Sequence, residues 1–286
     1  MLAHSMVQEG HWLFQRRSLV PVLFLPVLVA AFFEFEPLAG SEATQQLWAI
    51  GCLAVSLLGL AVRAAVIGVV PVRTSGRNRH RQVAEVLNTA GPYSLCRNPL
   101  YVGNYLIWLG IFSYPHHAWL VACFTLAFWL YYERIIAAEE DFLQSRFGKA
   151  YEQFASTVPC VLPRWSNWRR SHLAFSLRNV LRREYAGLLG ICLAFPLLNF
   201  AGHWLGEGRL LVEGRWLALG GFGFVQYGVL RTLRKQTQWL DVAGRVKERR
   251  ERRIDDDAGL GAEFEDTVED FPGPVAMPHP PAVAAA

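Results

Sequence analysis

Long runs of apolar residues alternate with short polar segments along this chain. Four runs approach the roughly 20 residues that an α-helix needs to cross a bilayer; they cover residues 18–35, 47–70, 185–205 and 211–230. Two shorter runs, 100–112 and 118–132, predict a tight helical hairpin whose arms require tilt or bilayer thinning. We therefore expect an all-α, polytopic membrane protein of about six transmembrane helices, with this short hairpin and with cytoplasmic interfacial helices.

Lys and Arg gather on one side of these predicted helices. They are frequent in the 71–98 connector and after residue 231, whereas the predicted outer loops at 37–46 and 114–117 have none. Because cytoplasmic loops retain basic residues, we expect both termini to lie in the cytoplasm. We expect the membrane to be a bacterial inner membrane. For the first apolar run, a cleaved signal peptide is the alternative to a retained helix. The basic loops predict contact with anionic lipid head groups and not with nucleic acid, which needs a basic face on a soluble domain.

Local composition divides the chain into four parts. Residues 1–165 contain the predicted membrane core, and residues 166–184 form a connector rich in Trp and Arg, which suits an interfacial segment on the inner leaflet. Residues 185–235 add a further pair of predicted transmembrane helices. Residues 236–286 form a tail that is first basic and then acidic and rich in Pro and Ala, a composition typical of disorder.

Overall composition argues against an ordinary soluble domain and against a metal site. More than half of the residues are hydrophobic, and the mean hydropathy is positive, +0.20. The five cysteines include no C-x-x-C pair, so we expect neither a disulfide framework nor a zinc cluster. The adjacent His116 and His117 have no nearby carboxylate and make a poor metal site, so we expect no bound metal.

The first candidate for chemistry is the segment GPYSLCRNPLYVG, residues 91–103, between two apolar runs. Gly91 and Pro92 predict a turn that lets a ligand approach the backbone closely. Arg97 supplies a permanent cation for a carboxylate or phosphate, and Pro99 suits the first position of a helix. The free N–H groups of that helix start would face an anion, although an ordinary interfacial turn has a similar composition.

The second candidate is an acidic pair, Glu139 and Glu140, which follows the hairpin at the membrane edge. Alone, the pair is also compatible with the solvated exit of a helix. The short hairpin, however, packs this helix against the first motif, so that cationic and anionic side chains converge near one membrane edge. A zwitterionic or sulfonium-bearing cofactor would match both charges.

Taken together, the two motifs resemble a known family. The segment GPYSLCRNPLYVG, followed over residues 139–163 by EE-x-x-L-x-x-x-FG-x-x-Y-x-x-F-x-x-x-VP-x-x-x-P, is similar to the isoprenylcysteine carboxyl methyltransferases, which are related to the phospholipid methyltransferases. The resemblance covers about residues 47–163. It implies an integral membrane enzyme that binds S-adenosyl-L-methionine at the cytoplasmic face, while a membrane lipid or lipid-linked substrate enters sideways from the bilayer.

The resemblance also implies which residues bind the cofactor. Tyr93, Arg97 and Pro99 match the family's cofactor-binding turn. Asn98 stands where many members have His, so that an imidazolium role is lost while hydrogen bonding survives, and Phe154 replaces a usual Tyr. A further stretch, whose backbone meets the methionine part of the cofactor, corresponds to Glu85, Val86, Leu87 and Asn88.

Glu139 and Arg134 carry the predicted catalytic roles. Glu139 matches a Glu that contacts the cofactor, and Arg134, shortly before it, is the nearest candidate for the anionic group of the substrate. Methyl transfer would proceed directly and in line, mainly through positioning. Because an anionic acceptor needs no general base, we expect a carboxylate or phosphate held by Arg134 or by Arg63, which lies within the second apolar run. His80 is a further candidate for binding the cofactor carboxylate.

Two other functions stay open on the sequence alone. A nicotinamide-dependent membrane reductase of a sterol-reductase-like type would need a second phosphate-binding cluster, for which Arg73, Arg77, Arg79 and Arg81 are available. A non-enzymatic transporter or scaffold would show broken helices in two matching halves, and the sequence contains no clear internal repeat. The sequence also leaves the oligomeric state open.

Overall fold

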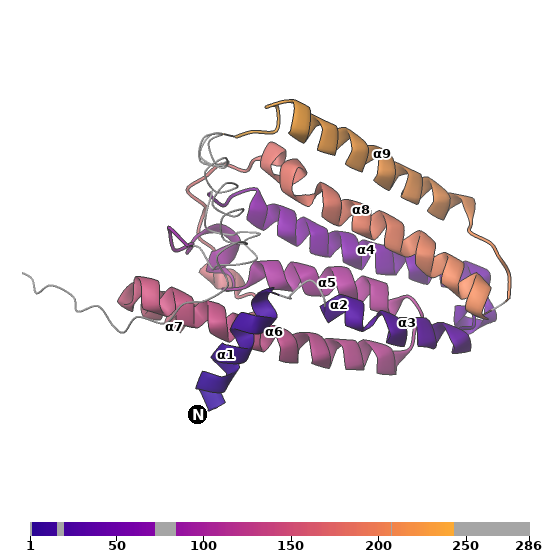
Figure 1. The fold of residues 1–286 in the computed structure, drawn as a ribbon, viewed down its shortest axis with the longest axis horizontal. Coiled ribbons are helices and arrows are strands. Elements are labelled where there is room, and N and C mark those ends of the chain that lie inside the picture. Colours follow the sequence, from indigo (N-terminus) through magenta and orange to yellow (C-terminus); the bar gives the residue numbers. More distant parts are fainter. Residues whose placement is uncertain (1, 16–19, 72–83, 207, 243–286) are drawn as a thin grey trace, which may run out of the picture. The chain divides into compact units, whose positions relative to one another are not determined.

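The computed structural model describes residues 2–15, 20–71, 84–206 and 208–242, which form only helices, turns and loops (Figure 1). The chain separates into two units, Met1–Val246 and Lys247–Ala286, and the first contains all the described residues. Its α-helices are α1 (Leu2–Gln15), α2 (Val20–Leu23), α3 (Leu25–Ala31), α4 (Glu42–Ile67), α5 (Pro99–Ser113), α6 (Ala118–Phe147), α7 (Lys149–Thr157), α8 (Leu177–Ala201) and α9 (Gly214–Gln236). Shorter helical turns are η1 (Phe32–Glu34), η2 (Leu38–Gly40), η3 (Gly91–Ser94), η4 (Trp165–Asn167) and the π-turn η5 (Gly202–Gly206).

Within the described residues, three helical segments are long and apolar enough to cross a membrane. They are α4, α6, and α8 continued by η5. Helix α5 is a shorter arm of 15 residues that packs beside α6, while α6 itself extends over 30 residues and carries the acidic pair beyond its apolar half. The expectation of an all-α integral membrane protein is thus confirmed.

The first apolar run does not form one continuous helix. Helix α2 ends at Leu23, α3 begins at Leu25, and η1 follows directly. Pro26 lies in the first turn of α3, where a missing N–H is tolerated, whereas inside a longer helix the proline ring would clash with the preceding turn. The prediction of a single helix over residues 18–35 is therefore wrong for the part that the structure describes.

Glycines set the close crossing of α4 and α5. A Cβ atom added at Gly59 would lie 2.6 Å from the carbonyl oxygen of Gly103, and one added at Gly103 would lie 2.6 Å from Cγ of Arg63. Neither position has room for a larger side chain without movement of the backbone. Small residues at helix crossings let membrane helices pack closely, and here they place α5, which begins at the 91–99 turn, directly against α4.

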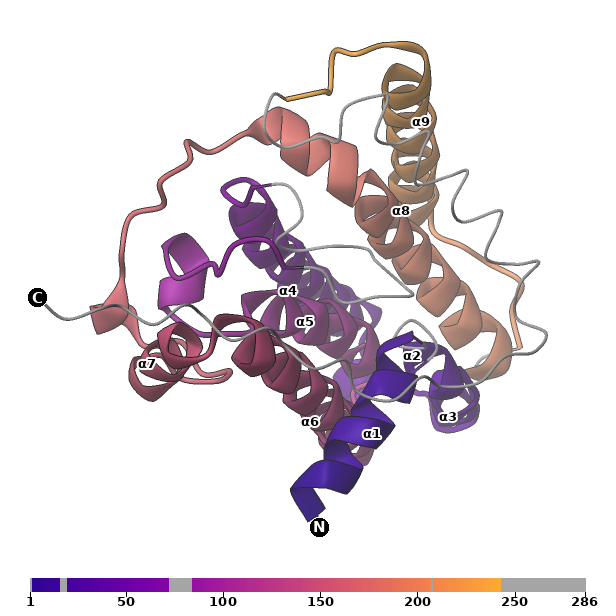
Figure 2. The ribbon, with the colours of Figure 1, turned by 60° about the vertical axis from the view of Figure 1, so that its left-hand side comes forward.

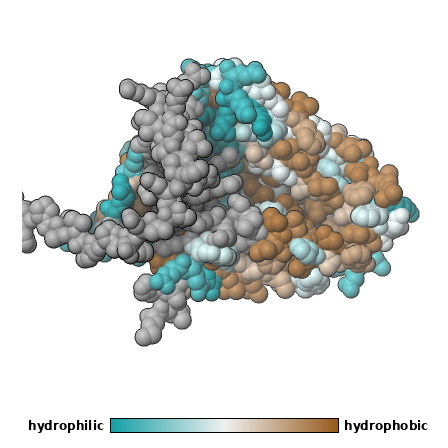
Figure 3. Space-filling view, viewed as in Figure 1, coloured by the Kyte–Doolittle hydropathy of each residue, from teal (hydrophilic) through white to brown (hydrophobic). Residues whose placement is uncertain are grey.

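Aromatic side chains fill the core on the other side of α5. The rings of Phe112 and Phe124 stack with centroids 4.3 Å apart, and those of Phe128 and Tyr132 stack at 4.2 Å. Helices α5, α4, α8 and α9 lie side by side in that order (Figures 1 and 2). The face seen in Figure 3 is largely apolar across its middle, with hydrophilic residues toward its ends. Such extensive apolar exposure fits contact with hydrocarbon.

A buried ion pair joins α4, α5 and α8. The Arg63 guanidinium donates to both carboxylate oxygens of Glu184, at 2.8 and 2.7 Å, and to Oδ1 of Asn104. The Glu184 side chain is only 6% exposed. Pairing therefore offsets the cost of placing a charge within α4, and removal of either partner would leave an uncompensated buried charge.

Candidate active site

The 91–99 turn is closed by the connector that follows α7. Gly91 takes the left-handed conformation, with φ of 62°, which glycine adopts without strain. Its N–H donates to the carbonyl oxygen of Arg169 at 2.8 Å, while Oγ of Ser94 donates to the Gly91 carbonyl at 2.7 Å and accepts from the Arg169 N–H at 2.9 Å. The backbone of Arg169 therefore fixes η3 from outside the two sequence motifs.

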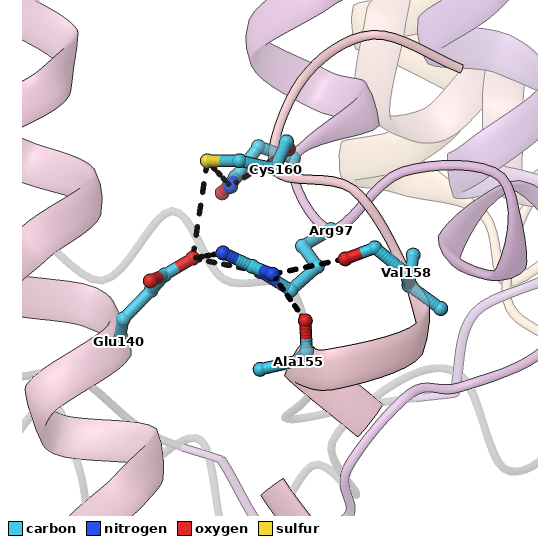
Figure 4. A network of polar contacts seen from close by, with 6 residues as sticks. Arg97, Glu140, Ala155, Val158 and Cys160 are labelled. Carbon is cyan, nitrogen blue, oxygen red and sulfur yellow. Dashed lines mark hydrogen bonds and ion pairs between the residues drawn. The ribbon is translucent and has the colours of Figure 1, made fainter. Parts of the chain in front are cut away.

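Arg97 joins the turn to α6 and α7 (Figure 4). Its Nε and Nη2 atoms both lie 2.8 Å from Oε1 of Glu140, and Nη1 donates to the carbonyl oxygens of Ala155 and Val158 at 2.8 and 2.9 Å. Carbonyls at the end of a helix have no partners within it, so the guanidinium satisfies the end of α7. Burial alone would lower the pKa of Arg97, but the Glu140 carboxylate more than offsets this and raises it, so Arg97 stays charged.

A short backbone ladder continues from Arg97 toward the end of α7. The Arg97 N–H donates to the carbonyl oxygen of Pro159 at 2.9 Å, and the Asn98 N–H donates to that of Cys160 at 3.1 Å. The Asn98 side-chain amide also donates to the Cys160 carbonyl, at 3.2 Å. The Arg164 N–H then donates to the Leu95 carbonyl at 2.9 Å. Asn98, which stands where many relatives have His, thus donates hydrogen bonds to the carbonyl of Cys160 from both its backbone and its side chain.

Tyr93 lies where charges of both signs meet. Burial, and then the Glu139 carboxylate, raise the pKa of the Tyr93 hydroxyl, while Arg183 and Arg63 act in the opposite direction. Charges on α6 and at the start of α8 thus both act on this hydroxyl. The two sequence motifs, 43 residues apart at Arg97 and Glu140, therefore converge as their spacing predicts.

The segment from Ala84 to Asn88 runs beside α6 and α7. The carbonyl oxygen of Ala84 accepts from Nε of Arg146, and Leu87 packs against a buried cluster of Tyr151, Phe154 and Val158. Glu85 and Val86 are exposed. The predicted cofactor-binding stretch thus lies against the same helix end that Arg97 holds, and Phe154 fills a buried apolar position there.

Comparison with known proteins agrees with this arrangement. Residues 48–150 match the phospholipid methyltransferase family. The cobalt-zinc-cadmium resistance protein CzcN of Cupriavidus metallidurans is 32% identical over 184 residues, which are 62% of this chain and 79% of that protein. The chain belongs to the phospholipid methyltransferase family. The same family includes the isoprenylcysteine methyltransferase-like proteins, which the two sequence motifs resemble.

Other members of this family match shorter stretches. The nickel-cobalt-cadmium resistance protein NccN of Alcaligenes xylosoxydans xylosoxydans is 32% identical over 126 residues, 42% of this chain and 58% of that protein. Protein-S-isoprenylcysteine O-methyltransferase of Schizosaccharomyces pombe is 34% identical over 83 residues, 29% of this chain and 35% of that protein. No solved structure matches the chain significantly. The family match contains Arg97 and Glu140, whereas α8 and α9 lie outside it.

Unlike the other predicted site residues, Arg134 makes its contacts away from the 91–99 turn. Its Nε donates to Oε2 of Glu9 on α1 at 2.7 Å, and Nη1 donates to the Leu130 carbonyl at 2.6 Å. Five residues along an α-helix turn a side chain by about 140°, so Arg134 and Glu139 leave α6 on different sides. The predicted role of Arg134 toward a substrate anion stays a prediction.

Several residues that shape the site were missed by the sequence reasoning. Glu140 was named only as half of the acidic pair, and its pairing with Arg97 was not predicted. Adjacent residues on a helix point in different directions, and the sequence does not say which of the two faces Arg97. Arg169 and Glu184 act through partners far away in sequence. No local pattern in the connector or in α8 signals either contact.

The remaining predicted candidates lie elsewhere or outside the described residues. Nε2 of His116 lies 2.8 Å from the Glu36 carbonyl oxygen, and Nε2 of His117 lies 3.1 Å from that of Ala31, so both anchor the segment after α3. Within the described ranges, no group of three or more His, Cys, Asp or Glu is arranged to hold a metal ion. Outside the described residues lie His80, Arg73, Arg77, Arg79 and Arg81, and with them the basis for the reductase alternative.

Proposed function

We propose that this family member is an S-adenosyl-L-methionine-dependent methyltransferase that acts on a membrane lipid or lipidated substrate at the cytoplasmic face. The observation that supports this most is the contact of Arg97 with Glu140, which joins the 91–99 turn to the acidic part of α6. The names of the two metal-resistance relatives state a resistance role and no reaction. The proposed reaction therefore comes from the site and from the family.

The charges around Tyr93 fit a zwitterionic cofactor with a sulfonium. Glu139 would offset the cofactor's positive charges, and the backbone of residues 85–88 would meet its methionine part. Arg183 and Arg63, whose positive charges oppose the rise in the pKa of Tyr93, suit a carboxylate or phosphate. When bound, S-adenosyl-L-methionine supplies an electrophilic methyl group.

The protein's own groups contribute positioning rather than proton transfer. Arg97 and Glu140 fix the turn, and the Tyr93 hydroxyl is protonated near neutral pH, as any tyrosine with an ordinary or raised pKa is. A protonated hydroxyl donates a hydrogen bond and accepts no proton. This favours an acceptor that is already anionic, a carboxylate or a phosphate, because such an acceptor needs no base.

The acceptor's anionic group would lie on the Arg63 side of Tyr93. Arg63 is held within the bundle by Glu184, and its charge still reaches Tyr93. Arg134 pairs with Glu9 in a partly exposed contact, with side chains 35% and 57% exposed. Exposed pairs contribute little stability, so Arg134 could exchange Glu9 for an anion that arrives from the bilayer edge.

We further propose six membrane crossings with both termini in the cytoplasm of a bacterium. Three crossings correspond to α4, α6 and α8 with η5. The others would be formed by the α2–η1 segment, α5 and α9, with thinning of the bilayer near the short helices. The exposed side chains of Trp165 and Trp168 in the connector suit contact with head groups of the inner leaflet.

The decisive test is transfer of a methyl label. Purified full-length protein is incubated with methyl-labelled S-adenosyl-L-methionine and either total membrane lipid or a prenylated peptide. Label in one lipid class, or in the peptide, identifies the acceptor, and no label in any of them refutes the proposal.

A binding measurement separates the cofactor from the acceptor. Glu139→Gln should weaken cofactor binding by about tenfold, since a hydrogen bond to a charged group is lost. Glu133→Gln, an exposed position on the same helix, is the matched control and should bind normally. Unchanged calorimetric binding by the Glu139 variant would remove this residue from the proposed site.

A further inference from the structure

The connector between α7 and α8 carries a basic surface. Residues 158–183 contain six arginines and neither Asp nor Glu. The three arginines nearest α8 contact or act on other residues of the protein. Arg164, Arg169 and Arg170 are exposed, and among the described residues their guanidinium groups have no hydrogen-bond or ion-pair partner. Residues 164–170 therefore present three positive charges that no described carboxylate neutralises.

Large apolar side chains lie among these arginines. Leu162, Trp165 and Trp168 are 80%, 76% and 58% exposed, and Phe175, farther along the connector, is 57% exposed. Clustered apolar surface of this kind marks a binding surface more often than a face that meets only water. Trp and Arg occur together at membrane interfaces, because a Trp ring suits the apolar boundary while a guanidinium pairs with phosphate. The outward side of the connector therefore has the composition of a surface that binds an anionic membrane.

The backbone of the same segment closes the candidate active site. The Arg164 N–H donates to the Leu95 carbonyl oxygen at 2.9 Å, and the Gly91 N–H donates to the Arg169 carbonyl oxygen at 2.8 Å. The Arg169 N–H donates in turn to Oγ of Ser94 at 2.9 Å; we call these three the closing hydrogen bonds. Figure 2 shows the connector as one extended segment between α7 and α8. Arg164 and Arg169 thus combine a guanidinium that no described residue pairs with and a backbone that holds the turn.

We propose that anionic phospholipid head groups bind the connector and thereby hold the 91–99 turn in its hydrogen-bonded form. The phosphates would pair with the three exposed arginines, while Trp165 and Trp168 would enter the boundary of the acyl chains. A zwitterionic lipid also has a phosphate, but its ammonium group repels guanidinium and leaves the membrane surface without net charge. The charge of the surrounding lipid would therefore regulate the shape of the turn.

The size of the effect follows from surface electrostatics. Near an anionic leaflet each basic residue strengthens binding about fivefold, so three arginines contribute on the order of 100-fold. Lipid that binds the closed connector in preference to the opened one shifts the local equilibrium toward the closed form. Salt and water screen exposed charges, which leaves an expected shift of at least about tenfold. Neither a methyl donor nor an acceptor takes part, so this proposal and the proposed function can fail separately.

The test places the full-length protein in lipid nanodiscs of phosphatidylcholine, either alone or mixed with phosphatidylglycerol. Hydrogen exchange is measured at the N–H groups of Gly91, Arg164 and Arg169, which donate the closing hydrogen bonds. Exchange through local opening should be at least about tenfold slower in the anionic discs. High salt should remove most of this difference, because it screens exposed charges. Equal exchange in the two kinds of disc overturns the proposal.

Variants locate the response to lipid charge. Replacement of all three exposed arginines by Gln should abolish the difference between the discs, and replacement by Lys should retain most of it, because Lys keeps the charge. The matched control removes three exposed charges from the end of α9 through Arg231→Gln, Arg234→Gln and Lys235→Gln, and it should respond like the wild type. If the triple Gln variant does not fold, Arg170→Gln alone should reduce the difference severalfold. A folded connector variant that responds fully, or a control that loses the response, overturns the proposal.

Discussion

Replacement of Glu140 by Ala should release the end of α7 from the 91–99 turn. The change removes the carboxylate that accepts from both Nε and Nη2 of Arg97, while the contacts of Nη1 with two carbonyls remain. The side chains of Arg97 and Glu140 are 16% and 29% exposed, so solvent compensates only in part. Since both donors share one oxygen, the loss amounts to one strong charge-assisted contact, about 2 kcal/mol. Glu140→Gln keeps a neutral acceptor and should cost about half as much.

Hydrogen exchange of the neighbouring amides measures this release. The N–H groups of Arg97, Asn98 and Arg164 form the ladder beside the contact, and a loss of about 2 kcal/mol corresponds to roughly 30-fold faster exchange through local opening. Glu140→Gln should give an intermediate rate, and Glu133→Ala should leave all three amides unchanged. Wild-type exchange at these amides in Glu140→Ala would show that Arg97 does not hold the ladder, and the argument for its role would fail.

Three further changes test other parts of the molecule. Gly103→Ala should destabilise the protein by about 1–3 kcal/mol through overpacking, because the added Cβ meets Arg63 and the Gly59 carbonyl. Gly51→Ala, which has open space around it, should leave stability unchanged. Equal unfolding midpoints for the two variants would contradict the overpacking argument. Glu184→Ala should cost about 3–5 kcal/mol by leaving Arg63 unpaired, and an apolar replacement of both residues should restore most of the loss, as measured by unfolding in denaturing detergent. The raised pKa of Tyr93 means that the folded state holds this proton more tightly than the unfolded chain. Stability from this group is therefore full below about pH 10 and is lost as the pH rises further; Tyr93→Phe should remove part of that alkaline loss, and an identical profile would argue against a buried hydroxyl.

Much of the architecture followed from patterns that local physics controls. Apolar length indicated membrane helices, and a short turn between two apolar runs indicated the α5–α6 hairpin. Hairpin geometry then brought the 91–99 turn to the acidic part of α6. The first apolar run was mispredicted because hydropathy ignores proline, and Pro26 ends one helix and begins another.

The partners of individual charges could not be predicted from sequence. Glu139 and Glu140 are equivalent in composition, and only the rotation of α6 decides which one meets Arg97. Arg63 finds Glu184 across 121 residues, and Arg134 finds Glu9 across 125. Such pairs depend on how distant helices pack, and no short-range period encodes that packing.

The hydrogen bonds between the connector after α7 and the 91–99 turn bear on which parts of this chain can be removed or separated. The Gly91 N–H donates to the Arg169 carbonyl, the Arg169 N–H donates to Oγ of Ser94, and the Ser176 N–H donates to the Gly68 carbonyl. Arg169 and Ser176 lie outside residues 48–150, the segment that matches the family model. A fragment trimmed to the shared stretch would keep both motifs and lose the clasp that shapes the first of them. The connector is therefore part of the fold of the turn: insertions between the two parts should be tolerated only where they spare these bonds, and a fragment that folds like the full chain should extend at least through Ser176.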